Sequence, residues 1–307
     1  MLFANDPISF PWFKLELDPS RGIELGFLNI RWYGLIIAIG LTLAVIYGLR
    51  RCKQFGIKQD DIIDGVLWIV PFAVICARLY YCIFSWSDYA ANPIKILYIW
   101  EGGLAIYGGV IGALIGVIVF CKVKKINVWA LFDLVSLGFM IGQSIGRWGN
   151  FFNREAFGSY CDNIFAMRIS SSHIPVPENP TAVFLANKEL LLQKAMEGNY
   201  AGMIQVHPTF LYESLWNIAG FAALHFISKN RKFDGQIALC YVIWYGLGRA
   251  IIEGLRMDSL MWGPIRVSQL LAAVSCVAAA AVLVVFAITR SKKPLYVSTL
   301  ETTDECH

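Results

Sequence analysis

Long apolar runs are the feature that most restricts how this chain can fold. Each run has close to the roughly 20 residues that a helix needs to cross a bilayer. Backbone amides inside a bilayer must be satisfied within the segment itself, so each run is expected to form a helix. Seven runs meet this description: Asn29–Leu49, Ile62–Phe84, Leu104–Phe120, Val128–Arg147, Thr209–Ile227, Gln236–Gly254 and Val267–Ile288.

The composition agrees with this expectation. The chain is 57% hydrophobic and 16% charged, which is more apolar and less charged than an average soluble domain. We therefore predict an all-α integral membrane protein with seven transmembrane helices. The first residues show no basic region ahead of an apolar core, so a cleavable signal peptide is not expected.

The charge of the short loops predicts the orientation of the helices. Lysine and arginine concentrate in cytoplasmic loops, and every second loop of this chain is basic. These basic residues follow the first, third, fifth and seventh runs: Arg50, Arg51, Lys53, Lys58, Lys122, Lys124, Lys125, Lys229, Arg231, Lys232, Arg290, Lys292 and Lys293. The N-terminus is therefore expected outside the membrane and the C-terminus in the cytoplasm.

The runs divide the chain into five segments. We expect an external N-terminal segment at 1–28, spans one to four at 29–147, and an external lobe at 148–207 between spans four and five. Spans five to seven follow at 208–289, and a cytoplasmic tail at 290–307. A loop as long as 148–207 is uncommon without structure of its own, so it is expected to fold as a small lobe.

Three shorter pieces carry separate expectations. Thr181–Met196 is expected to form an amphipathic helix within the lobe. Ile94–Trp100 is apolar but too short to span, which favours a re-entrant or interfacial piece. Tyr296–His307 is expected to be a short disordered tail.

The eight cysteines do not indicate a metal site. They show no CxxC or metal-type spacing, and most lie inside apolar runs, where cysteine behaves as a small hydrophobic residue. No metal and no cofactor are predicted. Cys82 and Cys161 could both lie outside the membrane, and whether they pair is left open.

One polar stretch interrupts the apolar pattern at the end of the fourth run. Ser144–Gly158 holds two arginines, two asparagines, a glutamate and three glycines within fifteen positions. A charge near hydrocarbon is costly, so an arginine there usually faces a partner or a water-filled cavity. The stretch therefore indicates a polar site at the edge of the membrane.

Arginines from three spans are expected to meet in the outer half of the membrane. The predicted orientation places Arg147 at the outer end of the fourth span and Arg78 in the outer third of the second. In the sixth span, Tyr245, Arg249 and Glu253 share one face because they are four residues apart. Converging guanidinium groups suit a phosphate, which they hold with paired hydrogen bonds. A phosphate at this depth belongs to a phospholipid headgroup, so a headgroup site is predicted.

Single residues of this set also have simpler explanations. Arg249 and Glu253 could pair only as neighbours on one helix. Glu213 could favour a helix start as a first-turn carboxylate. Tyr33 could be an interfacial aromatic residue that anchors the end of a span.

The polar stretch also carries a longer pattern, G-R-x-G-N-F-x-N-x-E-x-x-G, which resembles the signature of the bacterial prolipoprotein diacylglyceryl transferases. Four further segments resemble motifs of that family: Arg31–Gly34, Glu101–Gly109, His207–Glu213 and Tyr245–Glu253. The resemblance implies transfer of the diacylglyceryl group of phosphatidylglycerol to the lipobox cysteine of prolipoproteins. It also implies release of glycerol-1-phosphate, a place in the bacterial cytoplasmic membrane, an active site facing the outer leaflet, and no nucleic-acid partner.

The resemblance and the polar pattern together give the candidate site. The catalytic candidates are Arg147, Arg249, Tyr107, Tyr245 and Asn150. The substrate-binding candidates are Arg147, Arg249, Asn153, Glu155, Gly158, Tyr33, Arg78, Glu213 and Glu253.

One position departs from the family pattern. Many members carry histidine where this chain has Tyr107, and that histidine has been regarded as the base that deprotonates the acceptor cysteine. A tyrosine with a pKa near ~10 is a poor base unless nearby arginines lower its pKa. Alternatively, the acceptor thiol, with a pKa of ~8.5, ionises simply by entering an arginine-rich pocket. We favour the second explanation, and His207 is a further candidate base.

Two other classes of function would also place arginines in spans. A transporter for an anionic solute predicts inverted repeats and charges near the middle of the membrane, and neither is visible. A lipid-binding or scramblase-like protein would use the same headgroup site without chemistry. Only the family motif argues against that second class.

Overall fold

The structure is a computed structural model that describes residues 6–25, 28–99, 102–177, 180–257, 261–262, 265–290 and 294–304. The chain divides into two compact units. The first comprises Met1–Ala44, Ser136–Arg231 and Gln236–Ser291. The second comprises Val45–Val135, Lys232–Gly235 and Lys292–His307.

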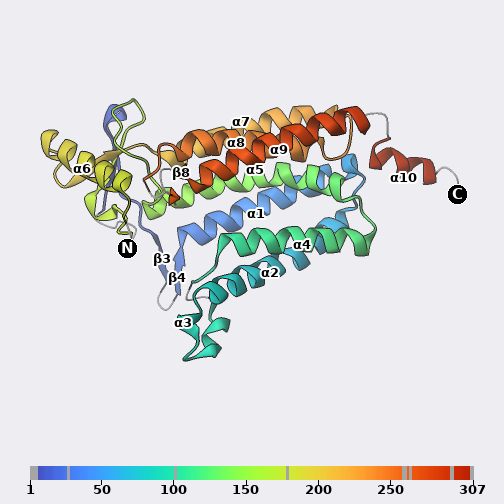
Figure 1. The fold of residues 1–307 in the computed structure, drawn as a ribbon, viewed down its shortest axis with the longest axis horizontal. Coiled ribbons are helices and arrows are strands. Elements are labelled where there is room, and N and C mark those ends of the chain that lie inside the picture. Colours follow the sequence, from blue (N-terminus) through green and yellow to red (C-terminus); the bar gives the residue numbers. More distant parts are fainter. Residues whose placement is uncertain are drawn as a thin grey trace. The chain divides into compact units, whose positions relative to one another are not determined.

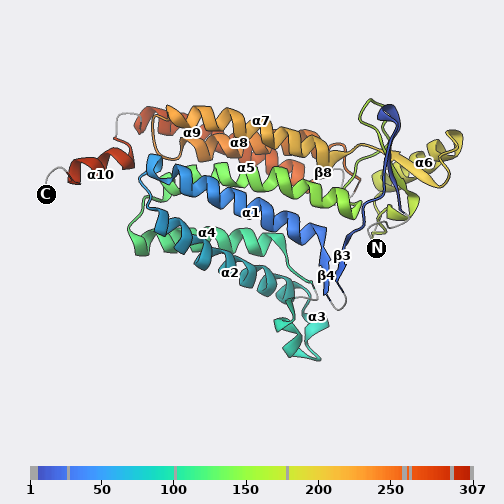
Figure 2. The ribbon, with the colours of Figure 1, turned by 180° about the vertical axis from the view of Figure 1, so that it is seen from behind.

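Long helices form the apolar part of the first unit. In Figures 1 and 2, α7 (Thr209–Lys229), α8 (Gln236–Glu253) and α9 (Val267–Thr289) run side by side. The C-terminal half of α5 (Val128–Asn153) lies against α7, since Ser214 donates a hydrogen bond to the carbonyl of Ser144. The N-terminal half of α1 (Trp32–Arg51) also belongs to this unit.

Two helices pack closely in the second unit. α2 (Gln59–Phe84) and α4 (Ile106–Lys124) lie side by side, with glycines of α4 at their interface. A Cβ at Gly108 would lie only 2.4 Å from the Cβ of Tyr80. Such small residues allow helices to approach closely in membranes. The second unit also contains the end of α1, the start of α5 and four short elements: η2 (Cys52–Phe55), α3 (Trp86–Tyr89), η3 (Pro93–Leu97) and α10 (Tyr296–Asp304).

The first unit also contains a lobe built on a small antiparallel sheet. Its strands are β1 (Ile8–Phe10), β2 (Leu15–Leu17), β5 (Met167–Ser170) and β6 (Met203–Val206), in the order β2-β1-β5-β6. The 3-10 turns η1 (Pro11–Phe13) and η5 (Ser171–His173) adjoin these strands. Helix α6 (Ala182–Glu197) completes the lobe, with the Thr181 side chain accepting a hydrogen bond from the backbone N–H of Phe184.

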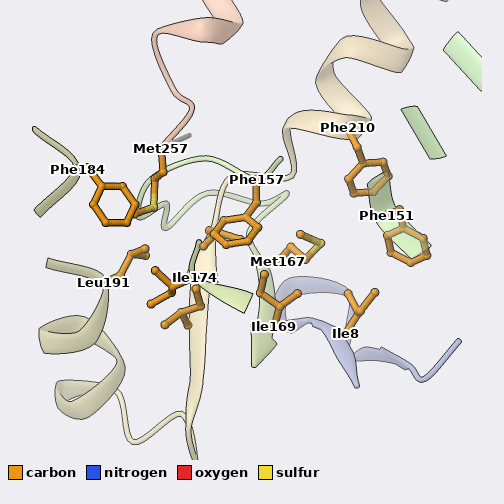
Figure 3. Close-up of a cluster of buried hydrophobic side chains, with 12 residues drawn as sticks. Ile8, Phe151, Phe157, Met167, Ile169, Ile174, Phe184, Leu191, Phe210 and Met257 are labelled. Carbon is orange, nitrogen blue, oxygen red and sulfur yellow. The ribbon is translucent and has the colours of Figure 1, made fainter. Parts of the chain in front are cut away.

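The core of the lobe joins it to the helices. Ile8 and Ile169 of the sheet, with Leu191 of α6, are fully buried within one hydrophobic cluster (Figure 3). The cluster extends to Phe151 near the end of α5 and Phe210 at the start of α7, whose ring centroids are 5.0 Å apart. The lobe is therefore packed directly onto the start of α7 and onto the end of α5, which carries the polar signature.

Two hairpins lead into helices of the first unit. β3 (Gly22–Leu25) pairs with β4 (Leu28–Arg31) immediately before α1. β7 (Met261–Trp262) pairs with β8 (Ile265–Arg266) immediately before α9.

The structure confirms a mostly helical membrane protein. Five helices of the described chain are long and apolar enough to cross a membrane: Trp32–Phe55, Gln59–Phe84, Ile106–Lys124, Val128–Asn153 and Val267–Thr289. Helices α7 and α8 coincide closely with the two remaining expected spans. Their polar residues lower their mean hydropathy, so the count of seven and the orientation remain predictions.

Two expectations need correction. The all-α description missed the strands of the lobe, because segments of three or four residues are too short to show a clear alternating pattern. The tail is not wholly disordered, because Tyr296–Asp304 forms α10. The backbone N–H of Tyr296 donates to Asp234 Oδ2 at 2.8 Å, and Leu300 lies against Gly56. Asp234 and Gly56 are both far from α10 in the sequence, so these contacts could not be predicted from it.

Some sequence expectations lie outside the described residues. They concern Trp100 of the interfacial piece, Glu101 of the glycine-rich motif, the basic pair Lys292 and Lys293, and the cysteine at 306.

Arg154 ties the N-terminal segment to the polar signature. Its side chain is fully buried and forms an ion pair with Asp6 at 3.2 Å. It also donates hydrogen bonds to the backbone carbonyls of Asp6, Pro19 and Phe152. His173 contacts the same carboxylate, with Nε2 2.7 Å from Asp6 Oδ2. The sheet and this guanidinium together hold β1, β2 and Asp6 against the lobe.

Replacing Arg154 with methionine is expected to destabilise the lobe by about 3 kcal/mol, because the backbone carbonyls of Asp6, Pro19 and Phe152 lose the buried guanidinium that donates to them. Limited proteolysis of the purified protein should then release the N-terminal segment faster than in the wild type. Lys194→Met removes only an exposed ion pair with Glu197 and serves as the control. Equal proteolysis of both variants would contradict the role assigned to Arg154.

Candidate active site

Helices α7 and α8 bring buried charges together in the first unit. Glu213 lies in the second turn of α7, and Arg249 and Glu253 lie on one face of the last turns of α8. Trp216 of α7 and Trp244 of α8 hold the two helices together, because each indole N–H donates to the backbone carbonyl of the other at 3.0 Å. Their rings stack with centroids 4.8 Å apart.

Glu213 is the centre of the charged cluster. Its Oε2 lies 2.6 Å from Nη2 of Arg147 at the end of α5, and 3.6 Å from Nη1 of Arg249. Its Oε1 lies 3.6 Å from Nη1 of Arg256, which follows α8. Arg249 also pairs with Glu253 at 2.7 Å. Arginines from three separate segments thus converge on one carboxylate.

Burial explains why these pairs form. Glu213 is only 5% exposed and Glu253 only 2% exposed. Removing an ionised carboxylate from water is costly unless it is paired and hydrogen-bonded. The described cluster holds three arginines and two glutamates, so a net positive charge remains where Arg147 and Arg249 are still partly exposed. The arrangement can therefore accept an anion.

Sequence reasoning missed two cations near this cluster. Arg256 pairs with Glu213, and Arg266 donates a hydrogen bond from Nη1 to the backbone carbonyl of Glu253. Arg256 lies three residues beyond the end of α8, in an antiparallel bridge with Gly158, so the helical spacing within α8 does not identify it. Arg266 lies beyond the β7–β8 hairpin, and no local pattern connects it to α8.

A small hollow lies beside Arg249 and Glu213. Its lining residues are Glu213, Trp216, Asn217, Tyr245, Gly248, Arg249 and Ile252. Tyr245, a catalytic candidate, therefore lies in the same hollow as Arg249, one helical turn away. Asn217 is buried and its Nδ2 donates to the backbone carbonyl of Glu213 at 2.9 Å, which holds it next to the cluster.

The remaining polar residues of the signature form a second group at the end of α5. Glu155 Oε1 accepts hydrogen bonds from Asn150 Nδ2 at 3.0 Å and from Asn153 Nδ2 at 3.3 Å. The helix continues to Asn153, six residues beyond the predicted end of the span. The asparagines are thus presented by an ordered helix rather than by a loop.

Two glycines of the signature allow close packing. A Cβ at Gly149 would lie 2.6 Å from Cδ2 of Tyr33, so the Tyr33 ring rests on the last turns of α5. A Cβ at Gly158 would lie 2.7 Å from the Cβ of His207 and 2.8 Å from the carbonyl of Leu255. Gly158 therefore allows three chain segments to pack closely, including the one that carries Arg256. It has no side chain that could contact a substrate.

His207 lies just before α7, next to a tyrosine. Its Nδ1 is 3.3 Å from the hydroxyl of Tyr212, which also accepts a hydrogen bond from Asn163. Burial lowers the pKa of His207, so the imidazole is neutral at neutral pH. The backbone carbonyl of His207 accepts a hydrogen bond from the N–H of Gly158, which gives this residue a structural role as well.

Arg78 and Tyr107 belong to the second unit and are described within it. All the donor nitrogens of Arg78 are engaged by backbone carbonyls, those of Lys95, Ile96, Tyr98, Gly102 and Gly103. The guanidinium thereby holds the segment before α4 in place. Tyr107 lies in the first turn of α4, and its side chain is 47% exposed.

Within the described ranges, no group of three or more His, Cys, Asp or Glu side chains could hold a metal ion. Cys82 and Cys161 are both buried free thiols in the structure. Burial raises the pKa of Cys161, so this thiol is unreactive at neutral pH.

Gly158→Ala is expected to reduce activity at least about tenfold, because the new methyl group must displace His207 or the carbonyl of Leu255. Gly146→Ala is the matched control, since a Cβ at Gly146 meets no atom within 4 Å. Activity per folded protein should be measured for both variants. Similar activities would show that the close approach at Gly158 is not required.

Comparison with known proteins identifies relatives along almost the whole chain. A family model described as "LGT: Prolipoprotein diacylglyceryl transferase" matches residues 21–285. The "Phosphatidylglycerol--prolipoprotein diacylglyceryl transferase" of Limosilactobacillus reuteri (strain DSM 20016) is 42% identical over 274 residues, which cover 89% of this chain and 92% of that protein. Proteins of the same name from Listeria welshimeri (43% identical, 83% of this chain, 84% of that protein) and Ligilactobacillus salivarius (41%, 84% and 90%) are also similar.

Proposed function

The chain belongs to the prolipoprotein diacylglyceryl transferase family, and we infer that it transfers a diacylglyceryl group from phosphatidylglycerol to the lipobox cysteine of prolipoproteins. The reaction releases glycerol-1-phosphate and is the first step of bacterial lipoprotein maturation. The convergence of Arg147, Arg249 and Arg256 on one buried position is the structural observation that best supports this activity.

We propose that Arg147 and Arg249 bind the phosphate of phosphatidylglycerol. Both retain partly exposed guanidinium groups, and such groups bind phosphate oxygens with paired hydrogen bonds. Glu213 and Glu253 orient the two arginines through the ion pairs that they form with them. Tyr245 lies in the hollow beside Arg249 and contacts the lipid near the reacting carbon.

The chemical step exchanges one bond for another. The thiolate of the acceptor attacks the diacylglyceryl carbon that bears the phosphate ester, so a carbon–sulfur bond forms while the carbon–oxygen bond breaks. The negative charge moves onto the leaving glycerol-1-phosphate, where the arginines stabilise it. The proton of the acceptor thiol leaves for solvent or for the departing phosphate.

The other candidates receive supporting roles in this proposal. Asn150, Asn153 and Glu155 form a hydrogen-bonded group at the end of α5 that orients the headgroup. Tyr33 and Gly158 set the packing around that group. Arg78, whose donors bind backbone carbonyls, shapes the segment that leads to Tyr107 rather than contacting phosphate directly.

We further propose seven spans, with α7 and α8 as the fifth and sixth, and the lobe outside the bacterial cytoplasmic membrane. The charged residues Glu213, Arg249 and Glu253 of α7 and α8 pair within the cluster, so they lower the hydropathy of these helices without having to face lipid. The active site then faces the outer leaflet. The acceptor is itself anchored in the membrane and approaches from the side.

Arg147→Ala is expected to lower diacylglyceryl transfer to a lipobox peptide by at least about 100-fold, as removal of a charge-stabilising donor does in other enzymes. The assay follows glycerol-1-phosphate release from phosphatidylglycerol by purified protein in lipid nanodiscs. Arg290→Ala removes the same charge just beyond the far end of α9 and should leave the rate unchanged. Wild-type rates for Arg147→Ala would refute the proposed phosphate site.

Tyr107→Phe is expected to retain transfer within about twofold from neutral to mildly alkaline pH, because the thiol ionises without help from this ring. Tyr107→His tests whether the histidine common in the family adds a second ionisation to the pH profile. A loss of more than about tenfold in the Phe variant would assign the tyrosine hydroxyl a direct role in the reaction.

A further inference from the structure

Glu213 occupies the position at which the arginines of the cluster meet. Arg147 of α5, Arg249 of α8 and Arg256 beyond α8 all lie within ion-pair distance of its two oxygens. A carboxylate held by guanidinium groups from several segments has the same charge and donor pattern as a phosphate monoanion in such a site. The position at which the arginines meet is thus occupied by an anion that belongs to the protein.

Differences in burial separate this carboxylate from the arginines around it. The side chain of Glu213 is 6% exposed, whereas the side chains of Arg147 and Arg249 are 21% and 18% exposed. A phosphate that reaches the arginines from the exposed side meets donors that are partly engaged by Glu213. The phosphate and the Glu213 carboxylate would then contact the same guanidinium groups, and two anions so close together repel each other. Binding of the phosphate therefore weakens the contacts of Glu213.

The hollow beside Glu213 has room for about one water molecule, enough for a small rotation of the side chain. The hollow is lined by Glu213 itself, by Asn217 and by Tyr245, and it lies on the side of the cluster toward the middle of α7 and α8. The tyrosine hydroxyl can donate a hydrogen bond to a displaced carboxylate. The backbone position of Glu213 is held at the same time, because Asn217 donates to its carbonyl.

We propose that Glu213 is an internal competitor of the lipid phosphate. It holds the arginines in place before the substrate binds, yields them to the phosphate during the reaction, and returns to them as glycerol-1-phosphate leaves. Glu213 is in this sense a positioning residue that also drives product release. The proposal rests on the proposed function, since it concerns the phosphate of that reaction.

The proposal and a purely orienting role make opposite predictions for the binding of product. If Glu213 only orients the arginines, its neutralisation disorders them and weakens the binding of anions. If Glu213 competes with phosphate, neutralisation leaves more donors free and strengthens binding. The sign of the change therefore decides between the two roles.

The test measures the affinity of sn-glycerol-1-phosphate for wild-type protein and for Glu213→Gln in lipid nanodiscs, by phosphorus NMR titration. We expect the dissociation constant to fall about tenfold in the variant, with a lower KM for phosphatidylglycerol and a lower kcat because release becomes slow. Unchanged or weaker binding in the variant overturns the proposal.

Two further variants keep the test decisive. Glu213→Asp retains the charge but shortens its reach, so it should also bind glycerol-1-phosphate more tightly than wild type, and it replaces Glu213→Gln if that variant does not fold. Glu253→Gln removes another negative charge, the buried carboxylate that pairs with Arg249. An equal increase in affinity in Glu253→Gln would reflect net charge alone and would also overturn the proposal.

The activity of the wild-type protein separates a failure of the proposed function from a failure of the role proposed for Glu213. If wild-type protein does not transfer the diacylglyceryl group to a lipobox peptide, the proposed function itself fails. If wild-type protein is active but Glu213→Gln binds glycerol-1-phosphate less tightly, only the competing role of Glu213 fails.

Discussion

The pairing of buried carboxylates with arginines is the constraint on which the first unit depends. Glu213 and Glu253 are almost fully buried, and each needs a positive partner within a few ångströms. Those partners come from α5, from α8 and from the segment beyond α8, so the charges also determine how these parts of the chain approach one another. In a purely apolar bundle, several registers of the helices would have similar energies. Here, a shift of one helix would separate a buried carboxylate from its arginine, which is costly.

A second buried arginine applies the same principle to the lobe. Arg154 belongs to the signature but turns away from the cluster, toward Asp6 and the backbone of the N-terminal segment. One short stretch of sequence therefore supplies a guanidinium to the candidate site through Arg147 and another to the lobe that adjoins it. This explains why so many polar residues are concentrated between positions 144 and 158.

The sequence allowed the helices and the pairing of Arg249 with Glu253 to be predicted, because both follow from local patterns. The expected spans agree with the helix bounds to within a few residues, and the four-residue spacing in α8 correctly placed Arg249 beside Glu253. The sheet, Arg266 and α10 were not predictable in this way. Each depends on contacts between distant segments, such as the pairing of β1 with β5 or the hydrogen bond from Tyr296 to Asp234, and no local periodicity reports such contacts.

Helix α10 has a practical consequence for work with this protein. Helix α10 belongs to the second unit, where Tyr296 and Leu300 lie against Gly56. These neighbours leave little room for a side chain at Gly56, and its φ of +71° favours glycine. Trimming the chain after α9 to aid crystallisation would remove the backbone donor to Asp234 and expose the surface around Gly56 that α10 covers. An affinity tag placed beyond α10 with a flexible spacer keeps that surface covered, and is the better choice for purification.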